Sequence, residues 1–175
     1  MAKLIMGIGL AGSGKTTTLK AFAGRYGYAF VDIQDVRERH GTKANELSTK
    51  SSWDELRQLV REHLQQNETV VVESSFVNGP DRRKFLEFAR NCGARKIQAV
   101  FLDTPHELAW ERNTVRERNI PREVFDERIR MLNEHPPAME DGFDGLYTID
   151  EYQTLVEAET RDEKREFKWG NTEMH

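Results

Sequence analysis

Several features that define large classes of protein are scarce or missing in this chain of 175 residues. It has one cysteine, Cys92, which excludes an internal disulfide and a cysteine-rich metal site. Its five histidines show no spacing typical of metal ligands. No apolar run approaches the length of a membrane span, and no apolar signal segment follows Met1. We therefore expect a protein that works in the cytoplasm and does not associate with a membrane.

Composition and charge limit the class of partner. Hydrophobic residues make up 37% of the chain and charged residues 32%, which is typical of one soluble globular domain. Residues 1–138 hold 22 Lys and Arg against 19 Asp and Glu (+3), whereas residues 139–175 hold 4 against 11 (−7). Such a mildly basic body is not that of a tight duplex binder, although a few arginines can hold a short nucleic-acid end. We expect residues 151–175 to form an acidic, solvated and partly frayed extension of the same domain, while its purpose and the oligomeric state stay open.

Strand-like and helix-like segments alternate along the chain. Ser52, with Glu55 three places on, predicts the start of a helix by the capping-box pattern, and Pro80 and Gly93 bound another. The alternation predicts an α/β fold, a doubly wound parallel sheet with helices on both faces. Strands are expected at residues 3–9, 28–32, 68–73, 96–102 and 146–149, and helices at 15–25, 52–66, 80–93, 105–118 and 121–133. We assign residues 1–150 to this domain, with a helical lid at about residues 110–125.

The segment Gly9-Leu10-Ala11-Gly12-Ser13-Gly14-Lys15-Thr16 is a complete G-x-x-x-x-G-K-[ST] phosphate loop. An apolar strand-like run precedes it and a helix-like run follows it, which is the order that its mechanism requires, whereas an ordinary glycine-rich turn has no such requirement. The loop predicts ATP with Mg²⁺ as its ligands. Backbone N–H groups and the helix N-terminus face the phosphates, Lys15 reaches the β- and γ-phosphates, and the Thr16 hydroxyl holds Mg²⁺. We expect ATP to contact Gly9, Ala11, Gly12, Ser13, Gly14, Lys15, Thr16 and Thr17.

Two acidic residues follow predicted strands at the edge where a parallel sheet binds ligands. Asp35, after the second strand, can take the proton from an attacking hydroxyl, or it can be the N-cap of a helix. Glu73 ends a run of three valines and can reach Mg²⁺ and orient an acceptor, or it can face solvent. The apolar run favours a central strand and so favours the functional interpretation of Glu73. The residues leave both interpretations of Asp35 open.

Four arginines lie between the last two predicted helices, where a lid would hinge. Arg112 and Arg116 are four residues apart and share one helix face. A pair of guanidinium groups can neutralise a transferring phosphoryl group, because their forked geometry suits its oxygens. The alternative is a solvated helix laced with glutamates, which suits Arg118 better. We therefore predict a catalytic role for Arg112 and Arg116.

Several stretches of the chain together point to one family. They are the phosphate loop Gly9–Thr16, Asp35 about twenty residues beyond the loop lysine, the helix start Asn78–Arg83 and the segment Phe101–Arg116, with a further loop at Pro137–Asp144. These stretches span most of residues 3–150, and the helix start and the lid segment are the more discriminating. They resemble the kinase domain of bacteriophage polynucleotide 5′-hydroxyl kinase and the small phosphate-loop kinases related to it, without the phosphatase domain. The resemblance implies that Asp35 is the general base.

The chain departs from that family on the acceptor side. The family has an arginine three places after its base, where this chain has Glu38; Arg37 or Arg39 would have to replace it. The family also has an aspartate near the end of its third strand, where this chain offers Glu73 or Ser75. The resemblance thus implies Arg37, Arg39, Glu73 and Ser75 as acceptor-binding residues, and it implies the use of ATP more directly than the identity of the acceptor.

The expected activity is the transfer of the γ-phosphate of ATP to a hydroxyl of a nucleic acid, a DNA or RNA 5′ end. One alternative is a DNA kinase that phosphorylates a hydroxymethyl group on a pyrimidine base within phage DNA. A second is a kinase of a free nucleotide or another small molecule. A third is a nucleotide-binding module that hydrolyses ATP without transfer to an acceptor.

Overall fold

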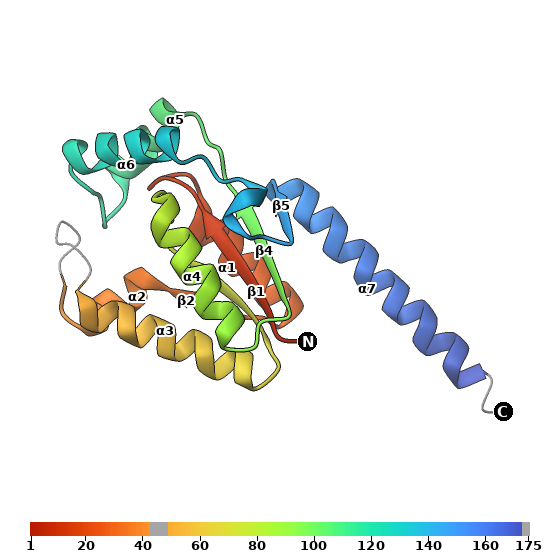
Figure 1. Cartoon of the computed structure of the whole chain (residues 1–175). Coiled ribbons are helices and arrows are strands. Elements are labelled where there is room, and N and C mark those ends of the chain that lie inside the picture. Colours follow the sequence, from red (N-terminus) through yellow and green to blue (C-terminus); the bar gives the residue numbers. More distant parts are fainter. Residues whose placement is uncertain (43–48, 173–175) are drawn as a thin grey trace.

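The computed structural model describes residues 1–42 and 49–172, and its centre is a five-stranded parallel sheet (Figure 1). The strand order is β2-β3-β1-β4-β5, so the chain moves first to one side of β1 and then to the other. This is the predicted doubly wound arrangement. The strands are β1 (Lys3–Ile8), β2 (Ala29–Asp32), β3 (Thr69–Glu73), β4 (Lys96–Phe101) and β5 (Gly145–Tyr147).

The central strands are buried along their whole length, which explains their apolar sequences. Every residue of β1 is buried, and β1 pairs with both β3 and β4. A strand covered on both faces needs apolar side chains at successive positions rather than at alternate ones. The run Val70–Val72 meets this need in β3. The carboxyl ends of these strands therefore open on one common edge.

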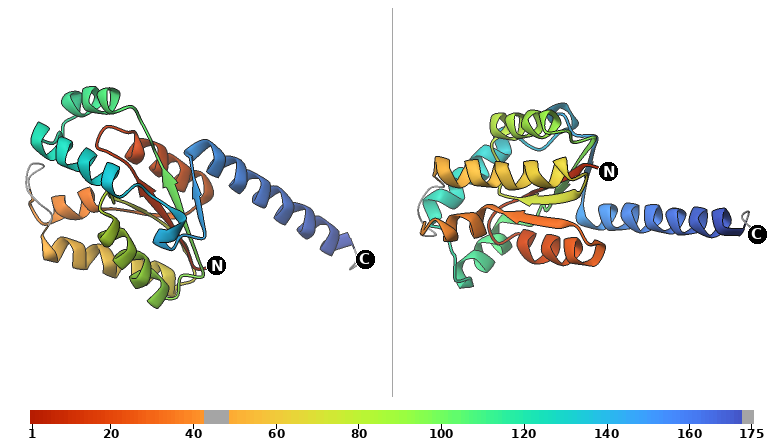
Figure 2. Two further views of the ribbon diagram at one scale, coloured as in Figure 1. Left: turned by 45° about the horizontal axis from the view of Figure 1, so that its top comes forward. Right: turned by 90° about the horizontal axis from the view of Figure 1, so that it is seen from below.

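Helices cover both faces of the sheet, as the two views of Figure 2 show. One face packs against α1 (Lys15–Tyr26) and the first turns of α7 (Ile149–Thr172), through a cluster that includes Leu19, Phe22 and Tyr152. The other face packs against α3 (Lys50–Gln65) and α4 (Gly79–Asn91), with α2 (Ile33–Arg39) at its edge. The core is thus two apolar layers on either side of one sheet.

A third apolar cluster lies beyond the carboxyl ends of the strands. Helices α5 (His106–Val115) and α6 (Arg122–Glu134) pack there on the phosphate loop, with Leu10 and Ala11 of the loop against Ala109 and Phe125. In Figure 1 these two helices stand above the upper end of the sheet. The loop is therefore fixed by the sheet on one side and by a pair of helices on the other.

Some element boundaries differ from those predicted. Helix α3 begins at Lys50 because Thr49, not Ser52, is its N-cap: the Ser52 N–H donates to Thr49 Oγ1 over 3.2 Å. Asp32 caps α2 by accepting the Gln34 N–H at 2.9 Å, so Asp35 is a residue of the first turn and not the N-cap. The N-cap interpretation of Asp35 is therefore wrong.

The C-terminal segment is one continuous helix from Ile149 to Thr172. Tyr152 and Val156 are buried in the sheet's core, so the start of the segment is part of the domain, and the fraying of its end stays a prediction. From residue 161 to residue 170 every side chain is exposed, and this half of α7 projects from the body (Figure 1). Residues 173–175 of the expected extension lie outside the described residues.

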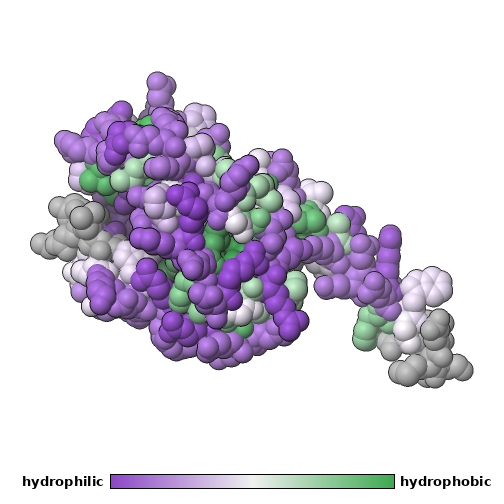
Figure 3. All heavy atoms as spheres, viewed as in Figure 1, coloured by the Kyte–Doolittle hydropathy of each residue, from purple (hydrophilic) through white to green (hydrophobic). Residues whose placement is uncertain are grey.

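The surface seen in Figure 3 is mostly hydrophilic, with small apolar areas between charged side chains. Within the described ranges, none of the helices combines the length and the apolar character needed to cross a membrane.

Candidate active site

The phosphate loop joins β1 to α1 and has the backbone shape that its glycines predict. Gly12 and Gly14 have φ of 79° and 90°, in the left-handed region that side chains other than glycine rarely adopt. A Cβ on Gly12 would lie 2.0 Å from the Ala109 carbonyl oxygen of α5, so the loop and α5 are in direct backbone contact. The Ser13 side-chain oxygen is buried and has no hydrogen-bond partner among the described residues. A loop of this form presents donors to a ligand.

Lys15 and Thr16, the first residues of α1, face the end of β3. Lys15 is buried; its Nζ donates to the Leu10 carbonyl at 2.8 Å and lies 3.8 Å from Glu73 Oε1. Thr16 Oγ1 donates to Glu73 Oε2 at 2.9 Å. Burial lowers the pKa of Lys15 to about 8, and the nearby carboxylate of Glu73 opposes that change. Glu73 is thus buried among loop residues and does not face solvent.

A second carboxylate lies beside Glu73. Asp32 ends β2 and is the register partner of Glu73, which ends β3, and both are buried. Burial, and then the charge of Glu73, raise the pKa of Asp32 to about 7. Two carboxylates held together away from water in this way favour a bound cation or a shared proton.

The oxygens at this point of the site fit Mg²⁺. The set is the Thr16 hydroxyl with the carboxylates of Glu73 and Asp32, and Mg²⁺ commonly binds through one or two carboxylates together with substrate phosphates. No group of three or more His, Cys, Asp or Glu in the described part of the chain forms an all-protein metal site. The donors therefore suit an ion that arrives with a nucleotide.

Asp35 lies on the outer side of the same edge. Its carboxylate is half exposed and lies 4.0 Å from Arg118 Nη2, and the same guanidinium pairs with Glu38. Asp35 is also close enough to raise the pKa of Asp32 through its charge. The interpretation of Arg118 as a residue paired with the glutamates of its own helix is wrong, because its partners are on α2.

Ser75, two residues beyond β3, connects three parts of the site. Its carbonyl accepts the Gly9 N–H of the phosphate loop at 3.2 Å, and its hydroxyl accepts from Arg128 Nη1 of α6 at 3.0 Å. Burial and the positive charges of Arg37 and Arg116 lower the pKa of Arg128. Arg128 thus lies at the end of β3 within electrostatic range of two further arginines, and such a group of cations favours an anion.

Arg112 and Arg116, which the sequence analysis placed on one helix face, have different surroundings in the structure. Arg116 ends α5, and its Nε donates to the Arg118 carbonyl at 2.9 Å. Burial lowers the pKa of Arg116, and the charge of Glu73 opposes that change. Arg112, in the last turn of α5, is exposed and has no ion pair with any residue of the described ranges. Only Arg116 is brought to the carboxylates, because α5 ends there and the two residues do not share a helix face.

Arg37 and Arg39 also have different surroundings. Arg37 is buried, its Nη1 donates to Gln34 Oε1 at 3.2 Å, and its charge acts on Arg128. Arg39 is exposed and pairs with Glu55 of α3 at 2.9 Å. Of the two arginines that flank Glu38, only Arg37 therefore points its charge toward the site.

A buried arginine holds the segment after β3 in place. Arg82 of α4 is fully buried and donates to the Phe76 carbonyl at 2.8 Å, to the His135 carbonyl at 2.7 Å and to Asp141 Oδ2 at 3.1 Å. Phe76 follows Ser75 and has φ of 48°, a strained conformation for an aromatic residue. Arg82 thus ties that strained residue to the end of α6, which also carries Arg128.

Three of these residues were not identified as site residues in the sequence. Asp32 is a strand-end carboxylate whose role becomes visible only once β2 is known to pair with β3. Arg128 lies on a helix with several other charged residues and carries no local signal. Arg82 belongs to the quoted helix start Asn78–Arg83, but nothing in a single sequence distinguishes it from the exposed Arg83.

The fold and this site together define the class: the chain has the fold of the phosphate-loop kinases, with a parallel sheet, flanking helices and a complete phosphate loop. It belongs to an AAA domain family, AAA_33, whose model matches residues 4–135.

Named relatives agree with this class. The chain is 28% identical to a shikimate kinase of Persephonella marina over 109 residues, which are 60% of this chain and 63% of that protein. The chain thus spans less than two thirds of the length of that curated relative.

Solved structures share the fold. A gluconokinase from Sinorhizobium meliloti 1021 superposes with a TM-score of 0.56 at 19% identity, over 83% of this chain and 81% of that chain. A chain of the Pnkp1/Rnl/Hen1 RNA repair complex superposes with a TM-score of 0.63 at 20% identity, over 76% of this chain and 44% of that chain. At these identities the likeness concerns the fold.

Proposed function

We propose that this protein is an ATP-dependent kinase that phosphorylates a hydroxyl on an acceptor with a negative charge of its own. One observation carries the proposal: Arg128 donates to Ser75, whose carbonyl accepts from the phosphate loop, and the charges of Arg37 and Arg116 act on Arg128. A catalyst for a neutral acceptor has no need for three neighbouring cations there, because the ATP phosphates already have Lys15 and the loop amides.

On the ATP side, we assign the triphosphate to the loop residues 9–17 and to Lys15. Thr16, Glu73 and Asp32 would hold Mg²⁺, which supplies charge neutralisation on the phosphates. Lys15 is well suited to exchange its hydrogen bond with the Leu10 carbonyl for a phosphate oxygen. A phosphate would also raise the pKa of Lys15 from about 8 and keep it protonated at neutral pH.

On the acceptor side, Asp35 is the proposed general base. It is exposed at the edge of the site, so an acceptor that approaches from solvent can reach it. Arg118 Nη2 lies 4.0 Å from the Asp35 carboxylate and can orient it toward the acceptor hydroxyl. Arg116 is the proposed residue that neutralises the transferring phosphoryl group, and Arg112 lacks the position for that role.

The preferred acceptor is a polynucleotide 5′-hydroxyl end. Its first phosphodiester lies one nucleotide from the reacting hydroxyl and would bind Arg37 and Arg128, because guanidinium groups match phosphate oxygens in pairs. The blocks Asn78–Arg83 and Phe101–Arg116, which resemble phage polynucleotide kinase, support this choice. So does the presence of an RNA repair complex among the structures with this fold.

The second candidate is a small hydroxy acid, in which a carboxylate replaces the phosphodiester on the same arginines. The named relatives favour it, because a shikimate kinase and a gluconokinase are among them. A hydroxymethylated base within DNA also offers both a hydroxyl and nearby phosphates.

Transfer of label from γ-labelled ATP distinguishes these acceptors. The panel is a 5′-hydroxyl oligonucleotide as DNA and as RNA, a duplex with hydroxymethylated pyrimidines, free nucleosides and small hydroxy acids. We expect label at the 5′ end of the oligonucleotide. Label in a hydroxy acid or an internal base alone would replace the preferred acceptor. Transfer to neutral alcohols as fast as to any anion would contradict the proposal itself.

Arg128→Ala tests the arginine group in the same assay. We expect the acceptor KM to rise at least tenfold, about 1.4 kcal/mol, while the KM for ATP changes little. Arg130→Ala is the matched control, because Arg130 lies on the same helix but is exposed and pairs with Glu127 and Glu134. An equal effect of both variants would show that Arg128 acts only through α6.

A further inference from the structure

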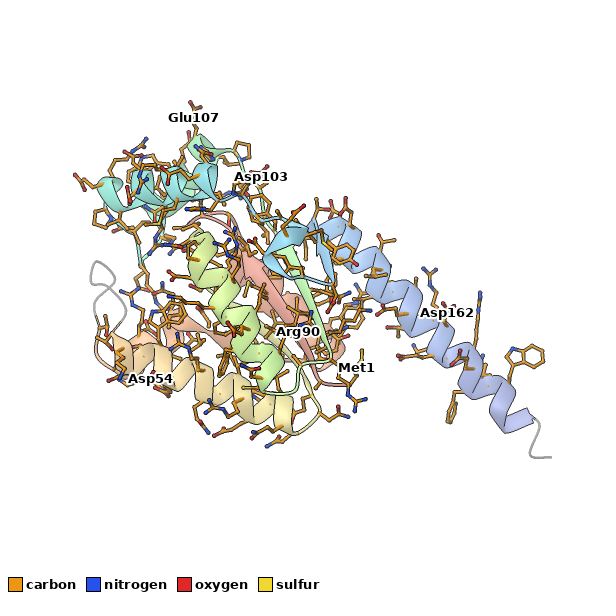
Figure 4. All side chains as sticks on the ribbon, in the orientation of Figure 1. Met1, Asp54, Arg90, Asp103, Glu107 and Asp162 are labelled. Atoms are coloured by element: carbon orange, nitrogen blue, oxygen red, sulfur yellow. The ribbon has the colours of Figure 1, made fainter. Side chains whose placement is uncertain are left out.

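The outer half of α7 projects from the body with its side chains exposed. Tyr152 and Val156 pack on the sheet near the start of the helix. At helical spacing, Thr160, Glu163, Lys164 and Phe167 continue on the same side of the helix, from the edge of the body, where the charge of Glu163 still acts on Lys3, outward into solvent. Figure 4 shows the side chains around Asp162 standing clear of the body. Phe167 has 72% of its surface exposed, and it borders a shallow hollow together with Glu163 and Lys164.

We propose that this face binds the same face of a second copy of the chain, so that two α7 helices pair side by side in antiparallel orientation around a two-fold axis. The axis passes between Glu163 and Lys164. Glu163 of each copy then opposes Lys164 of the other, and Phe167 of each copy covers Thr160 of the other. The pairing follows from the positions alone, because a two-fold axis at this point relates residue 163 to 164 and residue 160 to 167.

The charges on this face select a second copy over other partners. Residues 159–168 hold four carboxylates and four cationic side chains. A nucleic acid or an acidic membrane surface requires an excess of positive charge, which this segment lacks. In a parallel pair of the same helices, Glu163 would face Glu163 and Lys164 would face Lys164. The antiparallel arrangement is the one in which the central charges of identical helices attract.

The shape of the molecule allows this pairing. The exposed half of α7 projects away from the body, and an antiparallel partner would place its own body at the far end of the pair (Figure 1). The contact between residues 160–167 of the two helices would extend over roughly 12 Å. That is less than the surface a permanent dimer buries, so we expect a dimer that forms and dissociates with concentration and weakens at high salt.

Exchange of the central charges tests the proposal on the full chain by sedimentation equilibrium at low salt. Glu163→Lys alone and Lys164→Glu alone each place two like-charge contacts in the dimer, because the axis repeats the substitution. We expect each single variant to lower the association constant about tenfold, and the double variant Glu163→Lys/Lys164→Glu to restore it. The substitutions are on exposed positions of a helix, so the fold is expected to be kept, with circular dichroism as the check.

Two aromatic residues provide a matched control. Phe167→Ala should weaken the dimer, whereas Trp169→Ala should not, because Trp169 is equally exposed, at 73%, but lies on the opposite side of the helix. Three results would overturn the proposal: a chain that stays monomeric up to millimolar concentration, a dimer that the single charge variants leave unchanged, or a double variant that stays as weak as the singles. None of these results depends on the acceptor or on phosphoryl transfer.

Discussion

Asp32 and Glu73 are register partners at the carboxyl ends of neighbouring strands, and both carboxylates are buried beside Lys15 and Thr16. In the absence of a cation the pair favours one proton over two negative charges. This relationship accounts for the pKa of about 7 at Asp32 and for the fit of the site to Mg²⁺.

The raised pKa of Asp32 predicts how stability depends on pH without nucleotide and Mg²⁺. The folded protein keeps the Asp32 proton up to about pH 7, whereas the unfolded chain loses it near its ordinary pKa of about 3.9. The stabilisation from this group is therefore complete below about pH 4 and is lost as the pH rises through 7. Urea unfolding of wild type and Asp32→Asn from pH 4 to pH 8 measures it: only the wild type should show this decline. Parallel curves for the two proteins would contradict the raised pKa.

Gly12→Ala should disrupt the nucleotide site through the backbone. The residue has φ of 79°, and the added Cβ would lie 2.0 Å from the Ala109 carbonyl oxygen, so either the loop or α5 must move. We expect a lower melting temperature and a loss of ATP affinity of tenfold or more, measured by calorimetry. Gly24→Ala is the control, because a Cβ there meets nothing within 4 Å and alanine favours a helix interior by about 0.5–1 kcal/mol. Equal ATP affinity in Gly12→Ala and wild type would show that the loop tolerates the change.

Much of the fold follows from the sequence because its signals are local. A few neighbouring residues determine each of these elements. The valine run determines β3, and Pro80 and Gly93 mark the start and the end of α4. The extent of α7 is different: its charged outer half has no apolar face to bury, and only the packing of Tyr152 and Val156 shows where the helix is anchored.

Some residues of the site can likewise be identified from local sequence, whereas others are brought together only by the fold. The phosphate loop is contiguous, so Lys15 and Thr16 can be identified from spacing alone. Asp32, Arg116 and Arg128 come together from β2, α5 and α6, and their proximity depends on strand order and on where α5 ends. Spacing grouped Arg112 with Arg116 because it assumed one continuous helix. Ser75, Arg37 and Arg116 were named as site residues from the sequence, whereas Arg128 could not be, because only tertiary contacts bring it to Ser75.

Arg82→Ala should destabilise the protein by about 3–5 kcal/mol, because it leaves the buried Asp141 carboxylate and two carbonyls without their buried partner. Arg83→Ala is the neighbouring control: Arg83 also reaches Asp141, at 3.3 Å, but is half exposed, and we expect a loss of less than about 1 kcal/mol. Urea denaturation gives both values. Similar losses for the two variants would mean that the Arg82 contacts add nothing beyond a surface ion pair.

Asp35→Asn should lower kcat about 10²–10⁴-fold and leave the KM for ATP nearly unchanged, if Asp35 is the general base. Glu38→Gln is the control, because Glu38 shares the Arg118 guanidinium with Asp35 but has no proposed chemical role. Steady-state kinetics with saturating acceptor separate the two. A comparable fall in kcat for Glu38→Gln would show that the position of Arg118 matters and not the carboxylate of Asp35.

The account depends most on whether the γ-phosphate of ATP moves to an acceptor hydroxyl at the Lys15 site. The direct measurement is transfer of label from γ-labelled ATP, with Mg²⁺, to pooled hydroxyl acceptors by wild type and by Lys15→Ala. We predict labelled acceptor with the wild type and none with the variant. Label that appears only as free phosphate, or transfer that continues without Lys15, would contradict the account.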